Sequence, residues 1–99
     1  MGAVYAISKQ LPKSELYGLV SQMQRASVSI PSNITEGYAR KGTGEYIQFL
    51  SVAYGSAAEL ETQLIIVNQE YVKVGTEEAR VLLAEVQKML YSLMKKLKA

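Results

Sequence analysis

Apolar residues recur at alternating spacings of three and four through residues 44–71, which is the longest regular pattern in the chain. The row consists of Tyr46, Phe49, Ala53, Ala57, Leu60, Leu64, Val67 and Tyr71. This spacing keeps the side chains on one face of an α-helix. A second apolar row, roughly 100° around the same helix, consists of Ile47, Leu50, Tyr54 and Ile65. Because one face is enough for an intrachain core, two faces predict contact with a partner subunit.

A second helical pattern runs to the end of the chain. Gly75 interrupts the preceding helix, and Thr76 is a natural N-cap that is followed by Glu77 and Glu78 at the positive helix end. The apolar stripe that follows consists of Ala79, Leu82, Leu83, Val86, Leu90, Leu93 and Leu97. Three lysines close the helix: Lys95, Lys96 and Lys98. They offset the negative end of the helix dipole, and a phosphate contact is the alternative interpretation.

A third apolar row precedes these helices and contains a proline. The row consists of Leu16, Leu19, Val20, Met23, Ser27, Ile30 and Ile34. Pro31 lacks a backbone donor and presses against the carbonyl of Ser27, so we expect a kink. The alternative is a new helix that begins at Pro31. The row keeps its phase from Ile30 to Ile34, which favours one kinked helix over residues 14–40.

The opposite side of this helix carries a polar stripe: Gln22, Arg25, Ser29, Asn33, Glu36 and Arg40. Serine and asparagine weaken helices by competing for backbone groups, so such a stripe indicates an interface rather than a solvated face. Glu36 and Arg40 are placed to pair at i,i+4. Glu61 lies among the second apolar row of the 44–71 helix. It either pairs with Arg25 or Arg40, or keeps its carboxylate in water.

The remaining segments are short. Residues 4–11 predict two or three turns of helix, which Pro12 stops and which need docking to be stable. The glycines of 42–44 separate two helices, with Thr43 or Gly44 near the N-cap and Glu45 in the first turn. No strand or hairpin pattern occurs. The sequence therefore predicts one all-α domain over residues 1–99, with a short lead-in helix and three long ones.

The composition excludes most catalytic chemistry. The chain has no cysteine, histidine or tryptophan, and every carboxylate side chain is a glutamate. Disulfides, thiolate metal sites, histidine-dependent triads and the Glu-x-x-His pairs of di-iron bundles are therefore excluded. The KGTG stretch at 41–44 lacks the spacing and preceding strand of a P-loop. We expect no enzyme, no metal and no cofactor. With neither a secretory signal nor an 18-residue apolar run, we also expect a cytoplasmic protein without membrane contact.

Residues 21–64 carry a dense set of specific motifs. These are Arg25, the SIPSNI of 29–34, the EGY of 36–38, Arg40, Glu45-Tyr46, Phe49-Leu50 and the AELETQ of 58–63. Together they closely resemble the signature of bacterial four-helix-bundle proteins that are encoded in intervening sequences of large-subunit ribosomal RNA genes. The resemblance extends over residues 10–97. The family is also similar to the accessory protein of diversity-generating retroelements, a pentameric bundle that engages a reverse transcriptase and nucleic acid.

The resemblance implies an antiparallel up-down four-helix bundle that forms a homopentamer, with RNA, DNA or a reverse transcriptase as partners. The chain departs from the family in two places. Its first helix, residues 4–11, is much shorter than the full-length first helix of other members. Gly42 also stands where many members have a capping serine.

Two sets of residues are candidates for function. The expected subunit interface comprises Gln22, Ser29, Asn33, Glu36, Ile47, Tyr54 and Glu61. The candidate nucleic-acid contacts are Arg25, Arg40 and Lys41, supported by Lys9 and Lys13. The net charge of +2 is small, but a pentamer would carry about +10 if charges add. The sequence leaves two functions open: nucleic-acid binding by a non-enzymatic homo-oligomer, or a purely structural or reverse-transcriptase-accessory role.

Overall fold

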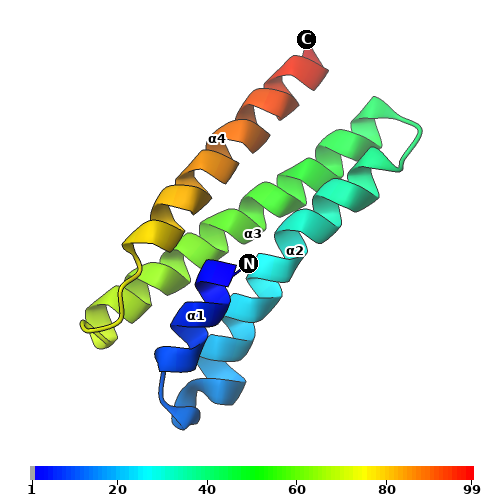
Figure 1. Ribbon diagram of the computed structural model, residues 1–99. Coiled ribbons are helices and arrows are strands. Elements are labelled where there is room, and N and C mark those ends of the chain that lie inside the picture. The colour runs from blue at the N-terminus through cyan, green and yellow to red at the C-terminus, as the bar shows by residue number, and fades with distance from the viewer. Residues whose placement is uncertain (1) are drawn as a thin grey trace.

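Four helices form where the apolar rows predict them. The computed structural model describes residues 2–99, and within them there is no strand. The α-helices are α1 (Gly2–Gln10), α2 (Ser21–Tyr38), α3 (Thr43–Glu70) and α4 (Glu77–Lys98). Figure 1 shows α2, α3 and α4 running alternately up and down along a bundle of 44 × 22 × 17 Å. This confirms the predicted all-α bundle with a shortened first helix.

The lead into α2 differs from the predicted single helix over residues 14–40. A 3₁₀ turn at Lys13–Glu15 and a π-helical stretch at Leu16–Val20 come first, and α2 begins at Ser21. The non-helical backbone lies at Gly18 (φ −107°, ψ −105°). α2 then continues through Pro31 to Tyr38, which excludes a new helix beginning at the proline.

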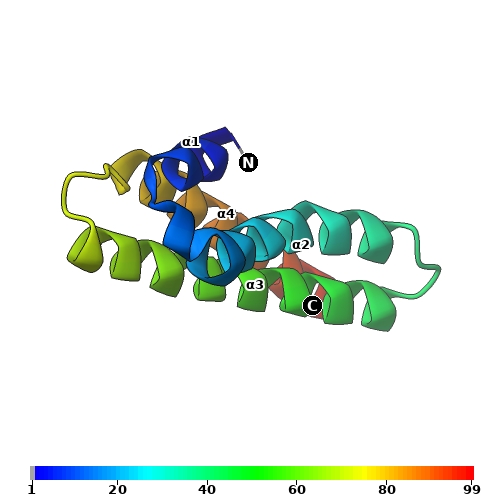
Figure 2. The same cartoon turned by 90° about the horizontal axis from the view of Figure 1, so that it is seen from below.

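One end of the bundle, which we call the covered end, has α1 packed against α2 and α4 (Figure 2). Its buried core consists of Val4, Ile7, Leu11, Val20, Met23, Ala26, Ile30, Ala57, Leu60, Leu64, Val67, Val74, Ala79 and Leu83. Each of the three long helices contributes apolar residues to this core. The burial of Val4, Ile7 and Leu11 is the docking that so short a helix needs to be stable.

The other end, which we call the uncovered end, lies beyond α1. It consists of the C-terminal part of α2, the first half of α3 and the second half of α4. Only Leu50, Ala53 and Leu90 form its buried core, with Ile34, Tyr46, Tyr54, Val86, Leu93, Met94 and Leu97 half-buried around them. Leu50 therefore serves the intrachain core, although the sequence placed it on the second apolar row.

The helices begin at or near the predicted N-cap residues, but the predicted N-cap side chains make no capping hydrogen bonds. Thr76 occupies the N-cap position of α4, with Glu77 and Glu78 in the first turn, but its side chain makes no capping hydrogen bond. The Thr76 hydroxyl is buried and has no hydrogen-bond partner within residues 2–99. The N-cap of α3 is Gly42, one or two residues before the predicted Thr43 or Gly44, and Glu45 lies in the first turn as expected.

Candidate interaction surfaces

Part of the polar stripe on α2 lies against α3. The hydroxyl oxygens of Ser29 and Ser56 are 2.7 Å apart and share a hydrogen bond between the two helices. The Asn33 side-chain amide donates to the Ser29 carbonyl oxygen at 2.8 Å and to the Ser29 hydroxyl oxygen at 2.9 Å. Ser29 and Asn33 are half-buried. Their short polar side chains thus have partners within the chain, while their predicted contact with another subunit stays a prediction.

The remaining polar positions of α2 face solvent. Gln22 and Arg25 are exposed at the rim of a shallow polar depression that Ser29, Ser56 and Glu59 also line. Within residues 2–99 the Arg25 guanidinium forms no ion pair. It is therefore accessible to an external anion, although the carboxylate of Glu59 lines the same depression.

Arg40 is held by two carboxylates at the end of α2. Its Nη2 lies 3.1 Å from Glu36 Oε2, and its Nε lies 3.9 Å from Glu45 Oε2. The guanidinium carbon also lies 4.9 Å from the centre of the Phe49 ring. The predicted Glu36–Arg40 pair is confirmed. Since both partners are largely exposed, the pair contributes less than about 1 kcal/mol to stability.

The second apolar row of α3 divides between core and surface. Ile47 and Tyr54 are half-buried, and Tyr54 packs against the Leu50 cluster. Ile65 is 41% exposed, and its neighbour Ile66 is 40% exposed. Glu61 is exposed and makes no salt bridge within residues 2–99. Glu61 was expected either to pair with Arg25 or Arg40 or to keep its carboxylate in water, and the second interpretation describes this structure.

The five candidate nucleic-acid contacts do not form one patch. Lys9 and Lys13 lie at the covered end, where Lys9 Nζ sits 4.7 Å from the centre of the Tyr5 ring. Arg25 and Arg40 are separated by about 22 Å along α2, from the rise of an α-helix. Lys41 follows in the loop between α2 and α3. These cations are therefore spread along the whole length of the bundle.

The candidate nucleic-acid contacts did not include the cations of α4, although a phosphate contact was the alternative interpretation of Lys95, Lys96 and Lys98. α4 ends at the same end of the bundle at which α2 and α3 are joined (Figure 1). The half-buried Leu93, Met94 and Leu97 pack there against the cluster around Leu50. The exposed cations that α4 adds are Lys88, Lys95, Lys96 and Lys98. The up-down topology that the resemblance implies could have indicated these cations, because it returns the end of α4 to the end of the bundle that holds the loop at residues 39–42.

A family model described as 23S rRNA-intervening sequence protein matches residues 1–92. The chain belongs to this family. The match confirms the resemblance carried by the motifs of residues 21–64, and it covers nearly the whole bundle. The biochemical function of the 23S rRNA-intervening sequence protein family is unknown. The comparison with curated proteins finds no match.

Within residues 2–99 this intervening-sequence protein has no group of three or more side chains placed to hold a metal ion. None of its helices in the same range combines the length and apolar character needed to cross a bilayer. The polar and charged groups described above gather in two places, the polar α2–α3 contact and the cations of the uncovered end.

Proposed function

We propose that this intervening-sequence protein is a non-enzymatic, homo-oligomeric helical bundle that contacts nucleic-acid phosphates through its uncovered end. The observation that carries the proposal is the division of charge along the bundle. Residues 36–45 and 88–98 hold six of the eleven lysines and arginines but two of the nine glutamates. The rest of the chain holds five cations and seven glutamates. The net charge of +2 thus conceals one basic end and one acidic end.

The chemistry of the basic end suits phosphates better than bases. Lysine is a mobile point charge that neutralises phosphate without reading sequence. The Phe49 ring lies under the Arg40 guanidinium, and two tyrosines are exposed at this end. Tyr38 is 76% exposed and packs edge-on against Tyr46 at a centroid distance of 6.1 Å, and Tyr91 of α4 is 59% exposed. Two isolated tyrosines on different helices offer little stacking for successive bases. We therefore expect salt-sensitive binding with little sequence preference, to RNA or DNA in the cytoplasm.

Self-assembly would multiply this charge. Exposed apolar side chains remain on the outer faces of α3 and α4: Val52, Ile65, Ile66, Val81, Leu82 and Tyr91. Burying such residues between subunits is favourable, and a ring would repeat the basic end around its axis. The pentamer that the resemblance implies is our proposal for this assembly. Sedimentation equilibrium is the measurement: a stable monomer at micromolar concentration contradicts assembly, and another ring size contradicts only the pentamer.

Titration of labelled RNA at several salt concentrations tests the nucleic-acid proposal. The variant Lys95→Gln with Lys98→Gln removes two charges from the uncovered end. Lys9→Gln with Lys13→Gln removes two from the covered end and is the matched control. We expect the first pair to weaken binding and to reduce the slope of log K against log salt by about two at most. The control pair should change neither.

Two outcomes contradict the proposal. One is equal weakening by the two double variants, since that would remove the special role of the uncovered end. The other is an absence of RNA and DNA binding at low salt while the oligomer persists, which favours a purely structural assembly protein. The reverse transcriptase that the resemblance implies stays a prediction.

A further inference from the structure

A shallow depression, which we call the Tyr91 depression, lies between α3 and α4 at the uncovered end. It is lined by Tyr54 of α3 and by Ala84, Gln87, Lys88, Tyr91 and Ser92 of α4. Its volume is about 590 Å³, which lies within the range of small-molecule sites. None of the lining residues is a carboxylate. The depression therefore combines aromatic rings with a positive charge.

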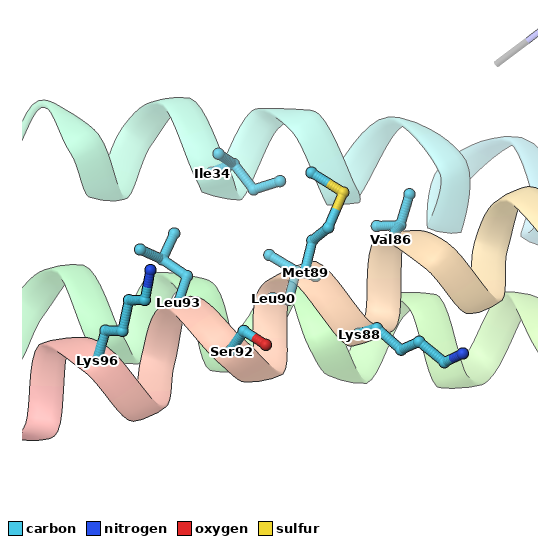
Figure 3. A pocket seen from close by; sticks show the side chains of 8 residues that line it. All are labelled: Ile34, Val86, Lys88, Met89, Leu90, Ser92, Leu93 and Lys96. Carbon is cyan, nitrogen blue, oxygen red and sulfur yellow. The ribbon is translucent and has the colours of Figure 1, made fainter.

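The depression is on a different side of α4 from the apolar groove that α4 forms with α2. Figure 3 shows Met89 and Leu93 projecting into that groove toward Ile34, whereas the Lys88 side chain points away from them. No residue of α2 lines the Tyr91 depression. What binds in one of the two places need not fill the other.

Tyr91 offers an accessible ring in this depression. Its side chain is 59% exposed, whereas Tyr54 is half-buried and packs against the Leu50 cluster. Ala84 lies seven residues before Tyr91, which is nearly two full turns along the same line of α4. Side chains of a helix lean toward its N-terminus, so the small Ala84 leaves space beside the Tyr91 ring. The ring is thus open to one planar ligand.

Two lysines flank Tyr91 on α4. Lys88 precedes it by three residues and Lys95 follows it by four, so the three side chains lie within about 60° around the helix. Both lysines are exposed, and neither forms a salt bridge within residues 2–99. α4 contains no carboxylate after Glu85. Two unpaired positive charges therefore lie about 10.5 Å apart along the helix, with the ring between them.

We propose that Tyr91 stacks on one base of a single-stranded nucleic acid, while Lys88 and Lys95 neutralise the phosphates on either side of that base. Stacking on a side chain requires an unpaired base, because the bases of a duplex are already stacked on one another. Every base has a flat face, so we expect little preference among sequences. The proposal rests on the nucleic-acid contact proposed for the uncovered end, and it narrows the ligand to single strands.

Self-assembly is the competing use of Tyr91, since the residue is among the exposed apolar side chains of α3 and α4. Burying it between subunits would also remove water from Lys88 and Lys95, which is costly for unpaired charges. The exposed Ile65 and Ile66 lie instead on α3, a helix without lysine or arginine. Charge therefore favours nucleic acid over a second copy at the Tyr91 depression.

Fluorescence anisotropy with two labelled strands of equal charge tests the stacking. One is a 12-nucleotide oligo(dT), and the other is an abasic strand with the same number of phosphates. We expect the wild-type chain to bind oligo(dT) at least about fivefold more tightly, which is the lower end of the contribution of one stacked base. Tyr91→Ser should remove this difference, and Tyr91→Phe should preserve it because the ring remains. Tyr17→Ser is the matched control, since Tyr17 is 92% exposed but lies in the Leu16–Val20 segment.

A tryptophan reporter measures the same contact directly. The chain contains no tryptophan, so Tyr91→Trp introduces a single indole ring at the depression. We expect oligo(dT) to quench its fluorescence and the abasic strand to leave it unchanged. Tyr17→Trp should respond to neither strand. Binding of oligo(dT) without quenching at position 91 overturns the proposal.

The outcomes separate this proposal from the one on which it rests. Equal affinity of the wild-type chain for the two strands overturns the stacking and leaves the phosphate contact standing. An absence of binding to either strand at low salt contradicts both proposals. Circular dichroism and sedimentation of Tyr91→Ser complete the test. If the wild-type chain is oligomeric and this folded variant is monomeric, a second copy occupies the depression and the stacking site is wrong.

Discussion

The covered and uncovered ends are built from the same three long helices, yet they bury their apolar rows very differently. Fourteen residues form the buried core of the covered end, whereas three form that of the uncovered end. α1 contacts only the first of these ends. Because α2, α3 and α4 pass through both ends, the difference in burial is caused by α1, which is the fourth helix of the bundle. Three helices leave one side of their shared core open, and a fourth must close it.

The uncovered end is nevertheless tightly packed between α2 and α3. Gly37 is buried there, and a Cβ atom added to it would lie 2.7 Å from Phe49 Cβ and 2.9 Å from Tyr46 Cδ1. Leu50 has no exposed surface. The uncovered end is therefore open only on the side of the α2–α3 pair that faces α4. The α2–α3 pair is continuous along the bundle, and α4 is covered at one end alone.

Truncation of one buried leucine at each end provides the largest expected effect. Leu64 is fully buried at the covered end, whereas Leu90 is 4% exposed but borders an open apolar groove between α2 and α4. We expect Leu64→Ala to lower the free energy of unfolding by about 3–5 kcal/mol and Leu90→Ala by about 2 kcal/mol, since solvent and neighbouring side chains fill the second void more easily. Urea denaturation followed by circular dichroism measures both. Equal losses would show that the uncovered end is as well packed as the covered one.

Glycine-to-alanine changes sharpen the contrast within the uncovered end. Gly37→Ala forces α2 and α3 apart, so we expect a loss of about 1–3 kcal/mol in the free energy of unfolding. Gly55→Ala is the control, because Gly55 lies inside α3 with no atom near its added Cβ. Alanine should stabilise α3 there by up to about 1 kcal/mol. Thermal unfolding of the two variants distinguishes them, and a stable Gly37→Ala protein would contradict the close approach.

The smallest expected effect comes from a side-chain hydrogen bond at the covered end. The Tyr71 hydroxyl donates a 2.6 Å hydrogen bond to Glu15 Oε2 and joins the end of α3 to the turn before α2. This bond raises the pKa of Tyr71 above 10.0, with burial and the charges of Glu15 and Glu70 adding to it. The folded chain thus holds the phenol proton more firmly than the unfolded chain.

It follows that this stabilisation is fully present below pH 10.0 and is lost as pH rises through the raised pKa of the folded chain. We expect Tyr71→Phe to unfold at slightly lower temperature at neutral pH, and the gap from wild type to close in strongly alkaline solution. Melting temperatures of the two proteins across this pH range are the measurement. A gap that stays constant would show that the hydrogen bond is not the source of the difference.

The sequence by itself determined the helices and their local contacts. The apolar rows located α3 and α4 closely, and the i,i+4 spacing predicted the Glu36–Arg40 pair, because these features depend on residues within a turn or two of one another. The short α1 was also readable from residues 4–11 and Pro12. The family motifs of residues 21–64 added the bundle architecture.

Only the tertiary structure decided which faces these helices share. The hydrogen bond between Ser29 and Ser56 joins residues 27 positions apart, and the close approach at Gly37 depends on Phe49 of the next helix. The irregular backbone lies at Gly18, in the segment that joins α1 to α2, whereas α2 continues through Pro31. Likewise, the lysines of α4 join Lys41 at one end only after three long helices pack alternately up and down. Such contacts depend on distances through space, and the spacing of residues along the chain does not specify them.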